Sequence, residues 1–173
     1  MSTTTSEDRL AEVQCRIDRL QARVQSGAPR ARRHLDALRD EEAAVRAALL
    51  QAPDEVDEKL GRLRTRLDVA EHSLEADGSD DWSTYVTAVE AELRSWDTYL
   101  ERLQASVAAR AWRERERAEA AIGDVRSRRI AVGERLARVR DSDGAVPQEA
   151  RKHVTAARDE LEQRAAELSR TLS

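Results

Sequence analysis

The sequence predicts an all-α protein, an elongated antiparallel helical bundle or coiled coil of about five helices, built around one long helix at about residues 80–141. Its composition is typical of long helices, because charged residues make up 37% and aromatic residues only 3%, with no Phe. Apolar residues recur at helical spacing along most of the chain. Segments with Gly and Pro separate these runs and predict the turns between helices.

The N-terminal part predicts three helices after a disordered start at residues 1–6. The first is expected at residues 6–25, where apolar residues three and four apart form the seam pattern of a coiled coil. The second is expected at residues 30–51. The third begins at Pro53, because Pro followed by acidic residues favours a helix start.

The long helix is predicted because the apolar positions from Trp82 to Val139 stay in one sector of a helical wheel. A single helix of this length would span roughly 90 Å. Its middle, residues 108–121, carries only Ala on this stripe and is interpreted as a solvated helical connector. The connector divides an antiparallel helical bundle at residues 7–107 from a helical hairpin at residues 122–173.

The last helix begins near Pro147, and part of it repeats an earlier sequence. Residues 31–35 and 39–41 match residues 150–154 and 158–160 at a constant offset of 119 residues. Both duplication and chance similarity between Ala/Arg/Glu-rich helices explain this match. If the duplication is real, one unit has about three helices and resembles spectrin-type repeats in plan only.

Charge is unevenly distributed, although the net charge of −4 predicts no general attraction to nucleic acid. Residues 68–101 hold ten acidic side chains and one arginine, whereas residues 102–140 hold eleven arginines and five acidic side chains. On a straight helix these two blocks cannot neutralise each other. The arginines flank the apolar stripe, so they form solvated flanks, select a partner helix by charge, or bind phosphate.

No pattern predicts catalysis, a cofactor or a metal site, and we expect a protein that is not an enzyme. A Gly-rich phosphate loop, Gly-x-Ser-x-Gly and Cys-x-x-Cys are all absent from the sequence. His34 and His153 occupy equivalent places in the repeat, at the edge of an apolar stripe. Each is interpreted either as a pH-sensitive contact or as an ordinary residue of the helix seam. Asp68 with His72, and Glu149 with His153, each supply only half of a metal site.

The cellular location is predicted from three features of the sequence. The single cysteine, Cys15, excludes an internal disulfide and fits a reducing compartment. The N-terminus lacks the basic and apolar regions of a signal peptide. No segment approaches 18 uninterrupted apolar residues, the length of a transmembrane helix. We therefore expect a cytoplasmic protein.

We expect a non-catalytic coiled-coil scaffold or adaptor that acts through self-association or by docking a partner helix. The hairpin at residues 122–173 has only two helices, so a second copy is expected to complete its core as a homodimer. The alternatives to this favoured homodimer are a helix of another protein, or folding back onto the first three helices. The alternative function is a nucleic-acid-associated protein using the Arg-rich half of the long helix. The expected interaction residues are Trp112, Ile122, Val125, Arg128, Val132, Arg135, Leu136 and Val139.

Overall fold

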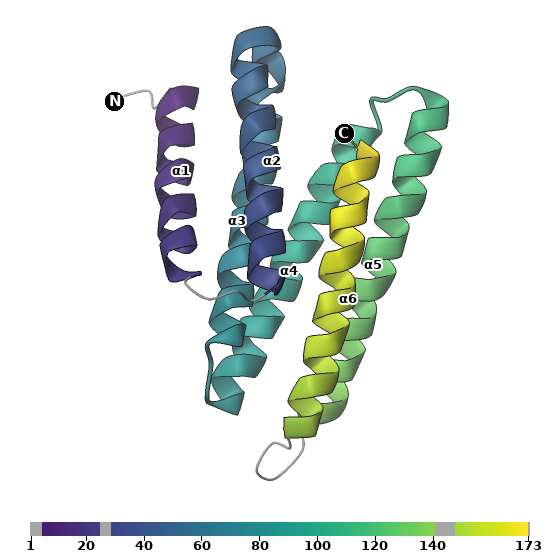
Figure 1. The fold of residues 1–173 in the computed structure, drawn as a ribbon. Helices are drawn as coiled ribbons and strands as arrows, with labels where there is room; N and C mark the ends of the chain where they lie inside the picture. Colours follow the sequence, from purple (N-terminus) through teal and green to yellow (C-terminus); the bar gives the residue numbers. More distant parts are fainter. Residues whose placement is uncertain (1–4, 25–28, 141–147, 173) are drawn as a thin grey trace.

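The computed structural model describes residues 5–24, 29–140 and 148–172, which form six α-helices, one short 3₁₀ helix and no strand (Figure 1). The prediction of an all-α helical bundle is therefore confirmed for these residues. Consecutive α-helices run in opposite directions. The elements are α1 (Ser6–Arg23), α2 (Pro29–Gln51), η1 (Pro53–Glu55), α3 (Val56–Asp77), α4 (Trp82–Val107), α5 (Trp112–Arg140) and α6 (Gln148–Leu172).

The helix starts follow from local sequence where capping groups are present. Thr5 caps α1, because its Oγ1 accepts a hydrogen bond from the Asp8 backbone N–H and the Asp8 side chain accepts one from the Thr5 backbone. Asp81 caps α4 by accepting a hydrogen bond from the Thr84 backbone N–H at 2.8 Å. The predicted disordered start and the turns near residues 26 and 141 lie largely outside the described residues.

The prediction of a single long helix is wrong. Helix α4 ends at Val107, α5 begins at Trp112, and the two pack side by side in opposite directions (Figure 1). The predicted helical connector at residues 108–121 is also wrong, because residues 108–111 form the turn and the remainder belongs to α5. In this turn the Arg110 backbone N–H donates to the Val107 carbonyl at 3.0 Å.

The turn contains only Ala and Arg, which favour helix, so local preference does not cause the reversal. Packing causes the reversal, because turning back lets α4 cover the apolar stripe of α5 together with α6. The longest helix, α5, has 29 residues and spans about 44 Å. This is about half of the roughly 90 Å expected for a continuous helix.

The reversal also pairs the acidic and basic blocks. Arg129 Nη2 lies 2.5 Å from Asp97 Oδ2, and Arg140 Nη1 lies 2.9 Å from Glu90 Oε1, each linking α5 to α4. These two ion pairs join the acidic and basic blocks across the α4–α5 hairpin, contrary to the expectation for a straight helix.

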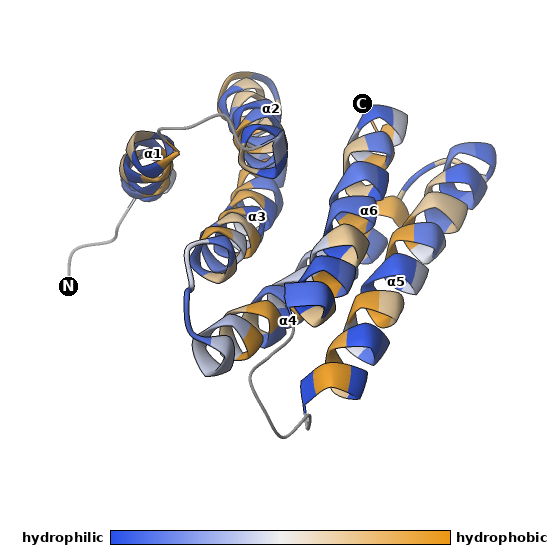
Figure 2. Ribbon diagram, turned by 60° about the horizontal axis from the view of Figure 1, so that its bottom comes forward, coloured by the Kyte–Doolittle hydropathy of each residue, from blue (hydrophilic) through white to orange (hydrophobic). Residues whose placement is uncertain are grey.

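The described helices enclose two hydrophobic cores instead of one bundle at residues 7–107. Helices α1, α2 and α3 form the first core, and α4, α5 and α6 form the second with two residues of α3. Figure 2 shows hydrophobic and hydrophilic positions alternating along every helix. Helices α3 and α4 pack along each other and join the two cores. Fully buried side chains include Leu38, Leu60, Leu63, Leu67, Trp96, Leu100 and Ile122.

Candidate functional site

The apolar residues expected to bind a second copy lie inside the protein's own second core. Four of them are at most 3% exposed, and Val139 is partly buried against the same core. Helix α4 occupies the position that a second chain was expected to fill. These residues are therefore not available to a partner in this fold, and the reason for expecting a homodimer is removed. The four buried residues are Ile122, Val125, Val132 and Leu136.

The other expected interaction residues lie at the surface of α5. Trp112 is 66% exposed, Arg128 is half-buried and pairs with Glu160 of α6 at 3.1 Å, and Arg135 is half-buried. Ile130 is 50% exposed and lies 18 positions after Trp112, on the same side of the helix. Five helical turns separate the two, so they form no continuous apolar patch.

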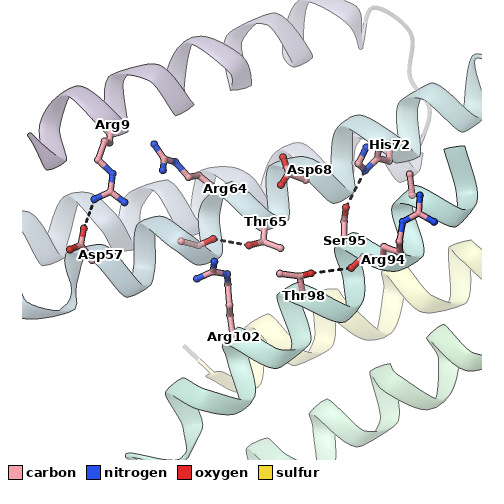
Figure 3. A pocket seen from close by; sticks show the side chains of 12 residues that line it. Arg9, Asp57, Arg64, Thr65, Asp68, His72, Arg94, Ser95, Thr98 and Arg102 are labelled. Atoms are coloured by element: carbon pink, nitrogen blue, oxygen red, sulfur yellow. Dashed lines mark hydrogen bonds and ion pairs between the residues drawn. The ribbon is translucent and has the colours of Figure 1, made fainter. Parts of the chain in front are cut away.

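A groove of about 490 Å³ lies between α1, α3 and α4 (Figure 3). Its lining residues recur at helical spacing on α3 and on α4, so each helix contributes one continuous side. Helix α1 adds a single residue. The lining residues are Arg9 from α1, Asp57, Gly61, Arg64, Thr65, Asp68 and His72 from α3, and Ala91, Arg94, Ser95, Thr98 and Arg102 from α4.

Contacts at both ends of the groove hold α3 and α4 together. A Cβ atom on Gly61 would lie 2.6 Å from Nη1 of Arg102, so the missing side chain lets this guanidinium rest against α3. At the other end, His72 Nδ1 lies 3.1 Å from Ser95 Oγ. The groove is therefore a fixed surface of two paired helices.

The acidic residues of the groove are paired. Asp57 Oδ1 lies 2.6 Å from Arg9 Nη1, and Asp68 Oδ1 lies 2.8 Å from Arg16 Nη2. Both arginines belong to α1, so these ion pairs also hold α1 against α3. Arg16 also donates to Glu71 from Nε and Nη2, so Asp68 shares this arginine and is only partly neutralised.

The basic residues of the groove are only partly paired. Arg64 lies 3.4 Å from Glu12 Oε2. Arg94 and Arg102 are both exposed, and neither has an acidic partner among residues 5–24, 29–140 and 148–172. Figure 3 shows their side chains toward opposite ends of the groove. The groove therefore presents two guanidinium groups that are available to an anion.

A second group of charged residues is buried where α2, α3, α4 and α6 meet. Arg158 Nε donates to Glu92 Oε2 at 2.7 Å, and its Nη1 donates to Asp77 Oδ1 at 2.8 Å. Arg66 donates to Glu162. Each carboxylate of this buried cluster lies beside an arginine, although Arg66 Nη1 and Glu162 Oε2 have no hydrogen-bond partner in the described part of the chain. The cluster joins the helices of the two cores.

Burial shifts the protonation of this cluster. It lowers the pKa of His34 to about 3, against the opposing effect of Glu162, whose Oε2 lies 3.4 Å from His34 Nδ1. It raises the pKa of Glu92, although Arg158 acts in the opposite direction. His34 is therefore neutral at pH 7.

Aromatic rings complete the buried cluster. The Cζ atom of Arg66 lies 4.6 Å from the ring centroid of Trp96, and that of Arg151 lies 4.5 Å from the centroid of Tyr85. Tyr99 donates a hydrogen bond to Glu41 of α2 at 2.7 Å. Guanidinium groups over aromatic faces are favourable, most strongly where water is excluded.

This buried cluster was not predicted from the sequence, although the sequence carries one signal of it. Glu92 lies four positions after Ala88 and four positions before Trp96, so the three share one face of α4. The carboxylate of Glu92 therefore lies within an apolar stripe. Arg158 and Glu162 continue the stripe of α6 in the same way. A charged residue within an apolar stripe predicts a buried ion pair, since an unpaired buried charge is costly.

Comparison with protein-family models, curated proteins and solved structures found no match. In the described part of the chain, no helix combines the length and apolar character that crossing a membrane requires. The same residues contain no group of three His, Cys, Asp or Glu side chains placed to hold a metal ion. Inference about function therefore starts from the groove and the buried cluster.

Proposed function

We propose that this chain is a non-catalytic helical adaptor that docks a helical segment of a partner protein in the groove between α1, α3 and α4. The main support is the pair Arg94 and Arg102, which lie exposed along the groove and have no acidic partner among the described residues. Both belong to α4, which α3 holds in place. A surface that is already ordered loses little conformational entropy when it binds.

The dimensions of the groove support a helical segment as the occupant. Its lining on α3 extends from Asp57 to His72, about 22 Å along the helix axis. A partner helix of about four turns matches this length. Ala91 and Ser95 have small side chains and leave room for a helix to lie close. We further propose coiled-coil-like packing for α1, whose buried residues keep three- and four-residue spacing.

A partner of different sequence is favoured over a homodimer, because α4 fills the place once assigned to a second copy. The nucleic-acid alternative has less support. Arg129 and Arg140 of α5 are paired with acidic residues of α4, and binding phosphate would break these pairs. We therefore propose that the protein is a monomer that binds another protein.

Site-specific photo-cross-linking tests this proposal. A photoreactive residue at Thr98, exposed in the groove, is compared with one at Ala137, exposed on α5 outside it. We expect that a partner protein cross-links from Thr98 and not from Ala137. The same partner, once purified, should give the same result. The cross-link should disappear when Arg94→Glu and Arg102→Glu are combined.

Two results contradict the proposal. Equal cross-linking from Thr98 and Ala137 would mean that the groove is not the docking surface. A cross-link that persists in the double charge-reversal variant would mean that the two arginines do not hold the partner. Sedimentation equilibrium at micromolar concentration tests whether a second copy of this chain binds in the groove. A dimer that the double variant abolishes would show that the second copy occupies the groove.

A further inference from the structure

We infer that the docked segment is acidic and carries carboxylates spaced to pair with Arg94 and Arg102. This inference rests on the proposed docking function and adds the chemistry of the partner. The two arginines are eight positions apart on α4, about 12 Å along the helix. Both are exposed and line the same groove.

The electrostatic balance of the groove favours an anion. Four arginines and two aspartates line the groove, so its lining side chains carry an excess of positive charge. The whole chain nevertheless has a net charge of −4. A local positive site on an acidic protein attracts acidic groups at short range.

The polar groups on the floor of the groove are already satisfied. Thr65 Oγ1 donates to the Gly61 carbonyl at 2.8 Å, and Thr98 Oγ1 donates to the Arg94 carbonyl at 3.2 Å. Ser95 contacts His72. The two arginines are therefore the groups with unused hydrogen-bonding capacity that best distinguish one partner from another.

The position of Arg102 adds order to this recognition. Its guanidinium lies against Gly61 of α3, with Cζ 3.3 Å from the place a Cβ would occupy. One edge of the guanidinium therefore rests against α3, and its remaining N–H groups can donate to a carboxylate.

A polypeptide fits the groove better than a nucleic acid. Nucleic-acid backbones carry a phosphate charge at every nucleotide. Such a backbone would bring charge close to Asp57 and Asp68 as well as to the arginines. An acidic segment with two spaced carboxylates can pair with Arg94 and Arg102. Neutral residues between the carboxylates keep negative charge away from the two aspartates.

A displayed library of random 16-residue peptides, selected on the immobilised full chain, tests the inference. We expect enrichment of Asp and Glu, with two acidic residues seven or eight positions apart. Fluorescence anisotropy then measures the best peptide against variants. Arg94→Glu combined with Arg102→Glu should weaken binding at least tenfold, whereas Arg113→Glu with Arg117→Glu, the same charge change at exposed positions of α5, should change it less than twofold.

Gly61→Ala provides a second test that does not depend on charge reversal. The added methyl group displaces the Arg102 guanidinium, so we expect peptide affinity to fall about threefold. Ala favours helix over Gly, so the melting temperature of this variant should not fall. A loss of affinity without a loss of stability separates recognition from folding.

Several results overturn the inference. These are selection of neutral or basic peptides, recovery of no acidic peptide, or equal weakening by the two double variants. Equally tight binding of a 16-nucleotide single-stranded DNA, lost in the groove variant, would assign the groove to nucleic acid. A neutral peptide that still cross-links from Thr98 would refute the acidic partner but keep the docking function. Failure of the Thr98 cross-link would refute docking itself.

Discussion

Arg158 of α6 donates a hydrogen bond from Nε to Glu92 Oε2 of α4 at 2.7 Å, and neither residue is more than 2% exposed. The same guanidinium reaches Asp77 and the carbonyl of Ser73 on α3. One side chain therefore ties three helices together across the boundary between the two cores. A buried ion pair contributes little net stability, but removing one partner leaves the other charge buried and unpaired.

Replacing Glu92 tests the importance of this pairing. We expect Glu92→Leu to lower the free energy of unfolding by about 1–3 kcal/mol, because Arg158 loses its buried carboxylate and keeps only the partly exposed Asp77. Combining it with Arg158→Met should restore part of the loss, since no unpaired charge remains. Urea denaturation followed by circular dichroism measures both. A double variant less stable than the single one would show that the charge on Arg158 is satisfied elsewhere.

His34 predicts a pH dependence of stability. Its pKa is about 3 in the folded chain and about 6.5 when unfolded, so between these values only the unfolded chain binds the proton. The free energy of unfolding should therefore fall as the pH decreases from about 6.5 toward 3, by up to about 1.4 kcal/mol per pH unit. Glu162, Arg66, Arg158 and Arg30 face His34, and the three arginines oppose its protonation.

Comparison of two histidine variants isolates this effect. His34→Leu should reduce the loss of stability between pH 6.5 and 4, whereas His153→Leu, at an exposed position of α6, should retain it in full. The raised pKa of Glu92 acts in the opposite direction and is common to both variants. Urea titrations at several pH values measure the slopes, and equal slopes in the two variants would refute the assignment to His34.

The two hydrophobic cores predict large effects of truncation. Leu67 of the first core and Leu100 of the second are both 0% exposed, so Leu67→Ala and Leu100→Ala should each cost about 2–5 kcal/mol. Leu50→Ala is the matched control at a side chain that is 85% exposed, and it should cost less than about 0.5 kcal/mol. Chemical denaturation measures all three, and similar losses at all three positions would contradict the burial pattern.

The two faces of α5 predict opposite responses to a new charge. Leu136→Asp should cost more than about 4 kcal/mol or prevent folding of the second core, because Leu136 is 3% exposed. Ile130→Asp on the same helix is 50% exposed and should cost less than about 1 kcal/mol. Thermal unfolding compares them. A well-folded Leu136→Asp variant with altered self-association would instead place this residue at an interface between chains.

Much of the fold follows from local signals in the sequence. Proline and acidic residues mark the start near Pro53, and the apolar seam predicted in residues 6–25 is buried at Leu10, Val13, Ile17 and Leu20. The reversal at residues 108–111 has no such signal, because Ala and Arg favour helix and the apolar phase continues across it. The complementary charge blocks were the available clue, since a hairpin pairs them, as between Arg129 and Asp97.

The groove was harder to predict than the helices. Its residues come from three helices, and on one helix Arg94 and Arg102 look like an ordinary solvated face. Only the packing of α3 on α4 reveals that they share a groove with Arg9 and Arg64. Recognition surfaces of this kind depend on the arrangement of helices, which periodicity in a single segment does not define.

The reversal at residues 108–111 is the feature on which the rest depends, because it lets α4 close the second core while its other face lines the groove. Pulsed electron paramagnetic resonance tests the reversal by measuring the distance between two spin labels. The labels are attached at Glu90→Cys and Arg140→Cys, in a chain with the exposed Cys15 replaced by Ser. The native side chains are 2.9 Å apart, so we expect a short distance between the labels. We predict a value below about 30 Å, whereas a distance near ~75 Å, the span of a continuous helix, would contradict the fold.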